Sequence, residues 1–179
     1  ISTIGENMTL RRAAKLSVAN GILASYVHSA VAPGRGKIGV LVSLESNADP
    51  NSLAELGRHL AMHIAAAKPL AVSQDDLDQA EVARERAVLS EQARDSGKPE
   101  EIIEKMVIGR LRKYYEEVCL LNQTYVIDGE TKISDVLANA EKELGAPVSV
   151  GGFVLMVLGE GVEKKEEDFA AEVAAAAGG

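Results

Sequence analysis

Two histidines stand four residues apart, a spacing that could hold a metal ion. His59 and His63 would share one face of a helix, because residues i and i+4 are neighbours on a helix surface. A zinc site needs further ligands, and the HExxH motif of zinc proteases also carries a Glu after the first His. Here Leu60, Ala61 and Met62 lie between the histidines, and no Cys or acid is placed as a third ligand. We therefore interpret both as buried or partly buried helix residues.

Other motifs that carry chemistry are also missing from the sequence. Gly34-Arg35-Gly36 and Gly159-Glu160-Gly161 match neither a GxxxxGK[ST] loop nor a GxGxxG turn, so no phosphate cradle is predicted. No GxSxG elbow surrounds a serine. We expect no catalytic residue, no metal and no cofactor, and we interpret the chain as a protein that binds another protein. A small-molecule enzyme remains the least favoured alternative.

Composition narrows the class of partner. The 179 residues are 46% hydrophobic and 26% charged with a net charge of −8, whereas phosphate binding relies on clustered Lys and Arg. The basic clusters Arg11-Arg12 and Arg110–Lys113 are interpreted as solvated faces. No run approaches the roughly 20 apolar residues of a membrane span. Cys119 is the only cysteine and fits a reducing compartment, with an inert, half-buried thiol. We expect a cytoplasmic protein with no nucleic-acid or membrane partner.

Alternating polarity near the start predicts antiparallel strands. Residues 8–18 alternate apolar and polar side chains, and Asn20-Gly21 is a hairpin turn signal that leads into a second strand over 22–28. Residues 37–44 (KIGVLVSL) predict a third, more buried strand. Asp49-Pro50 then starts a helix, which ends at Lys68-Pro69. Its apolar stripe is Leu53, Leu56, Leu60 and Ile64.

The middle of the chain predicts two long charged helices. The first runs from Ser73 to about Asp95, and the second follows Pro99 after a turn at Gly97. The first has a thin apolar seam of Leu77, Ala80, Ala83, Ala87 and Leu89. The second has a seam of Ile103, Val107, Leu111, Tyr114 and Val118. Narrow seams predict an antiparallel helical hairpin that projects as a coiled-coil arm.

The remaining residues complete an α+β fold, a small antiparallel sheet packed by helices. We expect a short extended piece over 124–127, a helix from Ser134 to Gly145, an inner strand over 148–158 with a bulge at Gly151-Gly152, and a short C-terminal helix from Phe169. The predicted division is 1–72 and 121–162 for the core, 73–120 for the arm and 163–179 for a helical module. From the residues alone, Phe169 is either a partner anchor or part of the chain's own core, and a structural or merely exposed role is favoured for His28.

Five motifs in chain order resemble the elongation factor Ts family. They are Ile4-Gly5-Glu6-Asn7 with Arg11-Arg12, Tyr26 and His28 with the strand at Gly39–Val42, Ala61–Ala66 ending at Lys68-Pro69, Ser96–Pro99 with Glu104–Val107 and Gly109-Arg110, and Gly159–Lys164 with Asp168–Ala174. Together they span the chain. The resemblance implies a guanine-nucleotide exchange factor that binds the GTPase elongation factor Tu and promotes GDP release. Such a factor must bind the nucleotide-free GTPase more tightly than the GDP-bound form.

The resemblance also implies contact residues. Ile4 and Gly5 would lie near the GTPase's nucleotide-binding domain, and His28 with its loop near the third domain. The tail helix would also pack on the nucleotide-binding domain, through Asp168, Phe169, Glu172 and Val173. The second interpretation is a structural domain whose arm mediates self-association as a homodimer.

One part of the family pattern lies outside these residues. The chain opens at Ile1 within an apolar–polar pattern, and we expect a segment upstream of it. In the family, a small helical domain and a TDFV segment that wedges into the Mg²⁺ region precede the Ile4–Asn7 stretch. We therefore expect these 179 residues to bind the GTPase but to exchange its nucleotide poorly, and a GDP-release assay with full activity would contradict that expectation.

Overall fold

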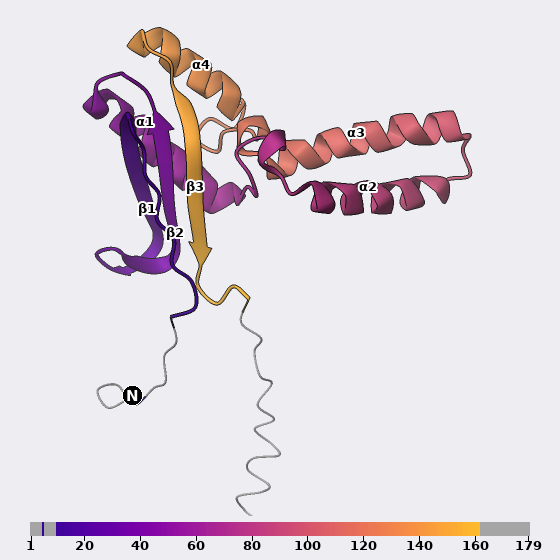
Figure 1. Ribbon diagram of the computed structural model, residues 1–179, viewed down its shortest axis with the longest axis horizontal. Coiled ribbons are helices and arrows are strands. Elements are labelled where there is room, and N and C mark those ends of the chain that lie inside the picture. The colour runs from indigo at the N-terminus through magenta and orange to yellow at the C-terminus, as the bar shows by residue number, and fades with distance from the viewer. Residues whose placement is uncertain (1–4, 6–9, 162–179) are drawn as a thin grey trace, which may run out of the picture.

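The computed structural model describes Gly5 and residues 10–161 of the chain (Figure 1). In that part, three strands form an antiparallel sheet in the order β1-β2-β3, accompanied by four α-helices. The strands are β1 (Gly21–Ala32), β2 (Arg35–Glu45) and β3 (Ser149–Val157). The helices are α1 (Pro50–Ala67), α2 (Gln79–Arg94), α3 (Glu100–Val118) and α4 (Ile133–Leu144), with 3-10 turns η1 (Gln74–Asp76) and η2 (Leu120–Asn122). The predicted α+β class is confirmed.

The core lies between the sheet and α1. Val40, Val42 and Leu44 of β2 point toward Leu53, Leu60 and Ile64 of α1, and all six are buried. The predicted stripe on α1 is therefore confirmed, with Leu56 partly buried beside it. Helix α1 also begins as predicted, because the Asp49 carboxylate accepts a 3.1 Å hydrogen bond from the Ser52 N–H and Pro50 occupies the first turn.

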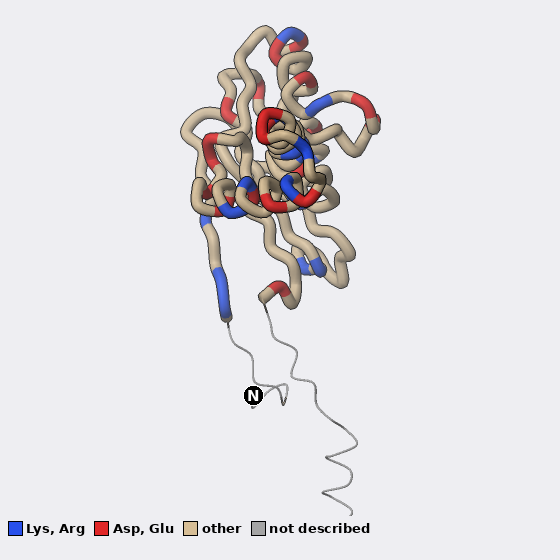
Figure 2. Tube along the Cα trace, turned by 90° about the vertical axis from the view of Figure 1, so that its right-hand side faces the viewer, with Lys and Arg blue, Asp and Glu red and all other residues tan. Residues whose placement is uncertain are grey.

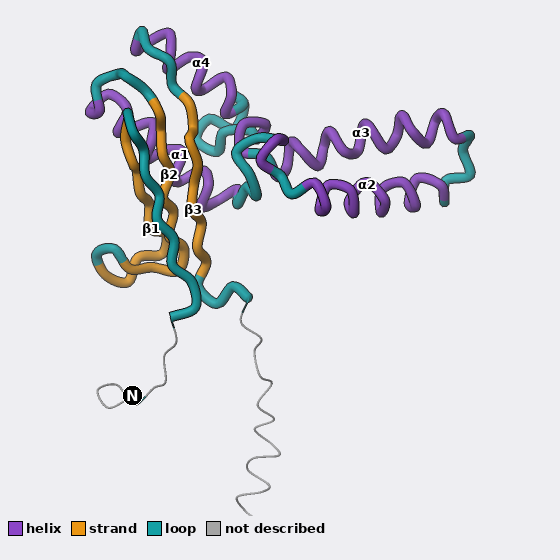
Figure 3. Tube along the Cα trace, viewed as in Figure 1, coloured by secondary structure: helices purple, strands orange, loops and turns teal. Residues whose placement is uncertain are grey.

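The segment before β1 is not a strand. Residues 10–18 run extended across the sheet face opposite α1 (Figures 1 and 3), and no backbone hydrogen bond joins them to another described segment. The predicted strand over 8–18 and its hairpin at Asn20-Gly21 are therefore wrong where the structure describes them. The alternation instead places Leu16 and Val18 partly buried, and Leu16 lies close to Gly152. Alternation reports which side chains face a surface, while a strand also needs a backbone partner.

Strand β3 lies at an edge of the described sheet. The sequence analysis predicted an inner strand, and that prediction is wrong. The strand is apolar because both of its faces are partly covered. Phe153 and Leu155 pack on the core, and the segment around Leu16 reaches the other face. The predicted bulge is confirmed: the register with β2 shifts between Ser43 and Leu44, which leaves Gly151 unpaired.

Helix α4 begins at Ile133 rather than at a Ser134 cap. Lys132 precedes it without a side-chain cap, and the Ile133 N–H donates to the Gln123 carbonyl at 3.0 Å. The loop before the helix thus satisfies an end group that a capping side chain would otherwise satisfy. The helix ends as predicted at Gly145, whose φ is 66°. The expected extended piece over 124–127 forms a single bridge, Thr124 to Lys132.

Helices α2 and α3 lie side by side and project from the sheet as an arm (Figures 1 and 3). The seam predicted for α3 is confirmed, since Ile103, Val107 and Leu111 are buried against Ala93 of α2. The seam predicted for α2 is confirmed at Leu77 and Leu89 and is wrong at its three alanines. Its Ala80, Ala83 and Ala87 are exposed, and the contacts come from Val82, Leu89 and Ala93, whose spacings of seven and four follow the 3.5-residue repeat of packed helices.

Helix α2 also starts later than predicted. The Ser73 hydroxyl and N–H both donate to the Asp76 carboxylate, at 2.6 and 3.0 Å, and this local turn closes η1. Asp78 then caps α2 by accepting from the Ala80 N–H at 2.9 Å. The Ser73–Asp76 turn and the Asp78 cap therefore divide what the sequence suggested was one helix.

The base of the arm is tied to the body by backbone hydrogen bonds. The Leu70 N–H donates to the Val118 carbonyl at 2.8 Å, and the Leu120 N–H donates to the Ala71 carbonyl at 2.9 Å. These bonds join the residues that follow α1 to the residues that follow α3. The arm thus leaves the body through two adjacent, hydrogen-bonded segments.

Candidate functional site

The end of the β1–β2 hairpin presents His28. Its side chain is exposed, and its Nδ1 shares a 3.1 Å hydrogen bond with the hydroxyl of Tyr26, two residues earlier on β1. The rings are tilted, with centroids 6.1 Å apart. Tyr26 packs on the core, so the pair connects the interior to the hairpin end. An anchored, exposed imidazole of this kind is suited to contact a partner.

The backbone around His28 is shaped by two local features. Ser29 has a φ of 51°, and the register with β2 shifts between Ala30 and Ala32, so β1 bends directly after His28. Gly36 on β2 pairs with Ala30 on β1. A Cβ added to Gly36 would be 2.5 Å from Val27 Cγ1 and 2.6 Å from the His28 carbonyl oxygen. Only glycine allows this close approach. The hairpin end therefore holds a defined shape.

Four basic residues line one open hollow at this end of the sheet. Arg11 and Arg12 come from the segment before β1, while Arg35 and Lys37 come from the start of β2. The hollow measures about 520 Å³. Figure 2 shows basic residues of both segments at the same end of the molecule, below the helices. The sequence analysis interpreted Arg11-Arg12 as a solvated face and missed this cluster, because no local signal links residues 11–12 to residues 35–37.

His63 is a structural residue, as predicted. It is fully buried, its Nδ1 accepts from the Val126 N–H at 3.3 Å, and its Nε2 lies 2.9 Å from the Gln123 side-chain oxygen. Nε2 therefore carries the proton, and both ring nitrogens are used. Burial lowers the pKa of His63, partly offset by the hydrogen bond to Gln123. Among the described residues, no group of three His, Cys, Asp or Glu side chains could hold a metal ion.

His59 lines a shallow hollow of about 360 Å³ between α1 and α4, together with Glu55, Asp128 and Glu143. Ionisable groups do gather here, but within the described chain no hydrogen bond joins any two of them. The Asp128 carboxylate accepts from the N–H groups of Glu130 and Thr131, which lowers its pKa. The arrangement supplies no paired nucleophile and base.

Cys119 lies fully buried at the base of the arm, in one apolar cluster with Ala71 and Leu77. The half-buried position predicted for it is wrong, because the arm's attachment encloses it. Burial raises the pKa of its thiol, and the nearby Asp76 carboxylate adds to the increase. The thiol is therefore protonated and unreactive at neutral pH.

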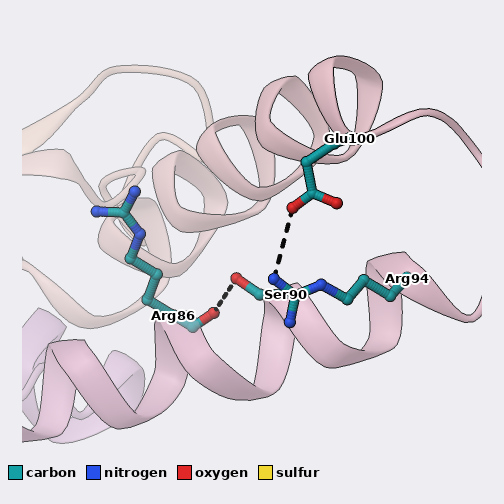
Figure 4. A network of polar contacts seen from close by, with 4 residues as sticks. All are labelled: Arg86, Ser90, Arg94 and Glu100. Atoms are coloured by element: carbon teal, nitrogen blue, oxygen red, sulfur yellow. Dashed lines mark hydrogen bonds and ion pairs between the residues drawn. The ribbon is translucent and has the colours of Figure 1, made fainter.

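The distal arm is held by apolar packing and by exposed polar contacts (Figure 4). Arg94 of α2 lies 3.5 Å from the Glu100 carboxylate of α3, and the Ser90 hydroxyl donates to the Arg86 carbonyl at 2.7 Å. Such exposed pairs contribute at most about 1 kcal/mol. The arm also exposes Val88, Ile102 and Ile108. None of the described helices is long and apolar enough to cross a membrane.

Comparison with known proteins identifies the family. The model of the family described as elongation factor TS matches residues 1–160. This chain belongs to the elongation factor Ts family. The elongation factor Ts proteins of Rhodospirillum centenum and Rhodospirillum rubrum are 61% and 63% identical to it, over 178 and 175 residues. That of Caulobacter vibrioides is 56% identical over 178 residues.

The chain covers only part of these elongation factor Ts relatives. The matches include 99%, 98% and 99% of this chain but 58%, 57% and 57% of the respective relatives. The chain thus spans somewhat less than three fifths of their length. The resemblance noted in the motifs is confirmed at the level of the family.

The contact residues implied by the resemblance to elongation factor Ts are only partly described. His28 lies exposed at the hairpin end, as given above, and Gly5 is exposed with a φ of 75°. Among residues 10–161, no atom lies within 4 Å of where a Cβ on Gly5 would stand. Ile4 lies outside the described residues, as does the predicted tail helix with Asp168, Phe169, Glu172 and Val173. Their roles stay predictions.

Proposed function

We propose that this chain binds the GTPase elongation factor Tu and contributes to guanine-nucleotide exchange during translation elongation, in the cytoplasm. The observation that carries the proposal is the match of residues 1–160 to the elongation factor Ts family. The chain acts here as a binding partner and not as an enzyme. This fits the described residues, whose histidines, cysteine and carboxylates serve packing, capping or solvent-exposed roles.

In this proposal the contact residues fall into three patches. Ile4 with Gly5 and the tail residues Asp168, Phe169, Glu172 and Val173 meet the nucleotide-binding domain, and His28 with the hairpin end meets the third domain. The exposed imidazole on a shaped hairpin supports the patch at His28. Exchange then follows from a difference in affinity. A factor that binds the nucleotide-free GTPase more tightly than the GDP-bound form promotes GDP release, and rebinding of GDP in turn weakens the binding of the factor.

The decisive test is a binding measurement with and without nucleotide. The chain is mixed with nucleotide-free elongation factor Tu, and the mass of the complex is followed by size-exclusion chromatography with light scattering. We expect a one-to-one complex that dissociates on addition of GDP and Mg²⁺. A complex that is equally stable with GDP and Mg²⁺ would contradict a role in exchange, and no complex at all would contradict the proposal.

The same measurement addresses self-association. The exposed apolar side chains Val88, Ile102 and Ile108 on the arm favour a homodimer as the second candidate. A chain that has twice its monomer mass when alone, and that does not change mass with elongation factor Tu, would support this candidate instead.

A further inference from the structure

Charge is arranged unevenly over the described structure. The whole sequence has 27 acidic and 19 basic residues, yet the hollow at the hairpin end has four basic residues and one acidic residue among its lining. Of these cations, only Arg12 forms an ion pair within the described chain, with Glu160 at 2.9 Å. The other three are Arg11, Arg35 and Lys37. A basic surface on an acidic protein marks a place where charge serves recognition.

The basic surface is continuous with apolar side chains. Val27, Ile38, Met156 and Leu158 line the same hollow, and Leu158 is 76% exposed. Val31, near the end of β1, is 81% exposed. A second open hollow of about 720 Å³ shares Arg12, Leu158 and Glu160, and continues along β3. It ends at the segment Lys68–Leu70, which adds another cation and an exposed leucine. Arg and Met mixed with apolar groups are typical of surfaces that bind proteins.

We propose that this basic end of the sheet docks an acidic surface on a protein partner. This inference rests on the proposed function, in which the partner is the GTPase. The approach of the GTPase is steered by the four cations Arg11, Arg12, Arg35 and Lys37. Opposite charge across an interface mainly raises the association rate, by up to several powers of ten at low salt. The apolar side chains around the cations then bury area once the surfaces meet.

A protein fits this surface better than a nucleic acid does. The Glu160 carboxylate lies within the cluster. It would repel the phosphates of a nucleic acid, whereas it could pair with an Arg or Lys side chain at the edge of a protein partner's interface. The net charge of −8 opposes long-range attraction to a polyanion. Among the described residues of the hollow no aromatic ring is available to stack on a base.

The test compares charge reversal at two places on the full chain. Arg35→Glu with Lys37→Glu reverses the exposed hairpin cations, and Arg58→Glu with Lys142→Glu makes the same charge change on exposed positions of α1 and α4. Association with nucleotide-free elongation factor Tu is measured by stopped-flow fluorescence at low and high salt. We expect the hairpin variant to associate about tenfold more slowly at low salt, with a difference that vanishes at high salt. The control variant should match the wild type.

A third variant should act in the opposite direction. Glu160→Gln removes the carboxylate from the hollow, and association should become faster at low salt. All substituted side chains are exposed, and melting curves will establish that each variant folds. Equal rates for the wild type and the hairpin variant, or equal slowing in both double variants, would overturn the proposal.

Two probes separate this inference from the proposed function. If the wild type does not bind the GTPase, the proposed function fails, and a poly-glutamate peptide is titrated into the isotopically labelled chain instead. Amide shifts confined to residues 11–12 and 35–37 would still support an acidic partner, and their absence would overturn the inference. A fluorescent RNA oligonucleotide is the second probe. RNA binding that Arg35→Glu with Lys37→Glu abolishes, while binding of the GTPase is unchanged, would also overturn it.

Discussion

At the scale of single residues, buried polar groups explain much of how the body is held. His63, Gln123 and Glu117 form a chain of hydrogen bonds, because the Gln123 amide nitrogen also donates to the Glu117 carbonyl at 2.6 Å. This chain links α1 to the last turn of α3. A buried donor or acceptor that loses its partner costs roughly 1–3 kcal/mol, so each member depends on the others.

His63 makes stability depend on pH in a predictable direction. Its pKa in the folded state lies below the ordinary value of 6.5, so near that pH the unfolded chain binds more protons. The stability from neutral His63 is therefore complete above about 6.5 and is lost as the pH falls toward the folded-state pKa. His63→Gln should lower the free energy of unfolding by about 1–3 kcal/mol at pH 8, with a smaller difference at pH 5.

Urea denaturation of wild type and variant across this pH range checks the prediction. His59→Gln on the same helix controls for the introduction of a glutamine, because His59 is only partly buried. Parallel curves for wild type and His63→Gln would mean that His63 does not control the pH dependence.

Two glycines should respond in opposite ways to the same substitution. Gly109 lies inside α3 with open space around its Cα, so Gly109→Ala should stabilise the chain by about 0.5–1 kcal/mol. Gly36→Ala would push a methyl group into Val27 and the His28 carbonyl, and it should destabilise by about 1–3 kcal/mol. Denaturation midpoints measure both. A neutral Gly36→Ala would show that the hairpin end adjusts freely.

At the scale of elements, the arm and the body have separate apolar cores. The cluster of Ala93, Ile103, Val107 and Leu111 lies within α2 and α3, and no residue of the main core comes from residues 79–118. The third cluster, around Cys119, joins them at the base. The narrow contact between the two helices suits an element that projects rather than one that packs on the sheet.

The distal arm should therefore be removable. Replacing residues 86–110 with a flexible linker keeps Val82 and Tyr114 of the basal cluster. We expect helical circular dichroism to fall in proportion to the residues removed, while the melting temperature of the body changes by only a few degrees. Aggregation or loss of the cooperative transition would contradict the predicted division that assigns residues 73–120 to an arm.

At the scale of the whole molecule, two features leave the layered body in different directions. The arm extends to one side, and the basic end lies where the hairpin meets the segments that lead to both chain ends (Figures 1 and 2). A partner that docks at the basic end would thus approach His28 and Arg35 together with the segment that holds Arg11 and Arg12. This arrangement is compatible with an interface built from several patches far apart in the sequence.

Local patterns predicted most of the elements of this fold. The Asp49-Pro50 start of α1, the Gly145 end of α4, the bulge at Gly151-Gly152 and the α3 seam all follow from residues within one or two turns of each other. Three of the failures share one cause. Residues 10–18, the start of α2 and the edge position of β3 depend on which distant or competing group satisfies a backbone hydrogen bond.

The family, the α+β class and the lack of recognisable catalytic motifs could be read from residue types and short spacings alone. That Arg11 and Arg12 share a surface with Arg35 and Lys37, and that His63 lies buried with both ring nitrogens hydrogen-bonded, became evident only from the folded structure. The physical reason is that charge and burial act through space. When two residues are more than twenty positions apart along the chain, no local sequence pattern predicts that folding brings them together.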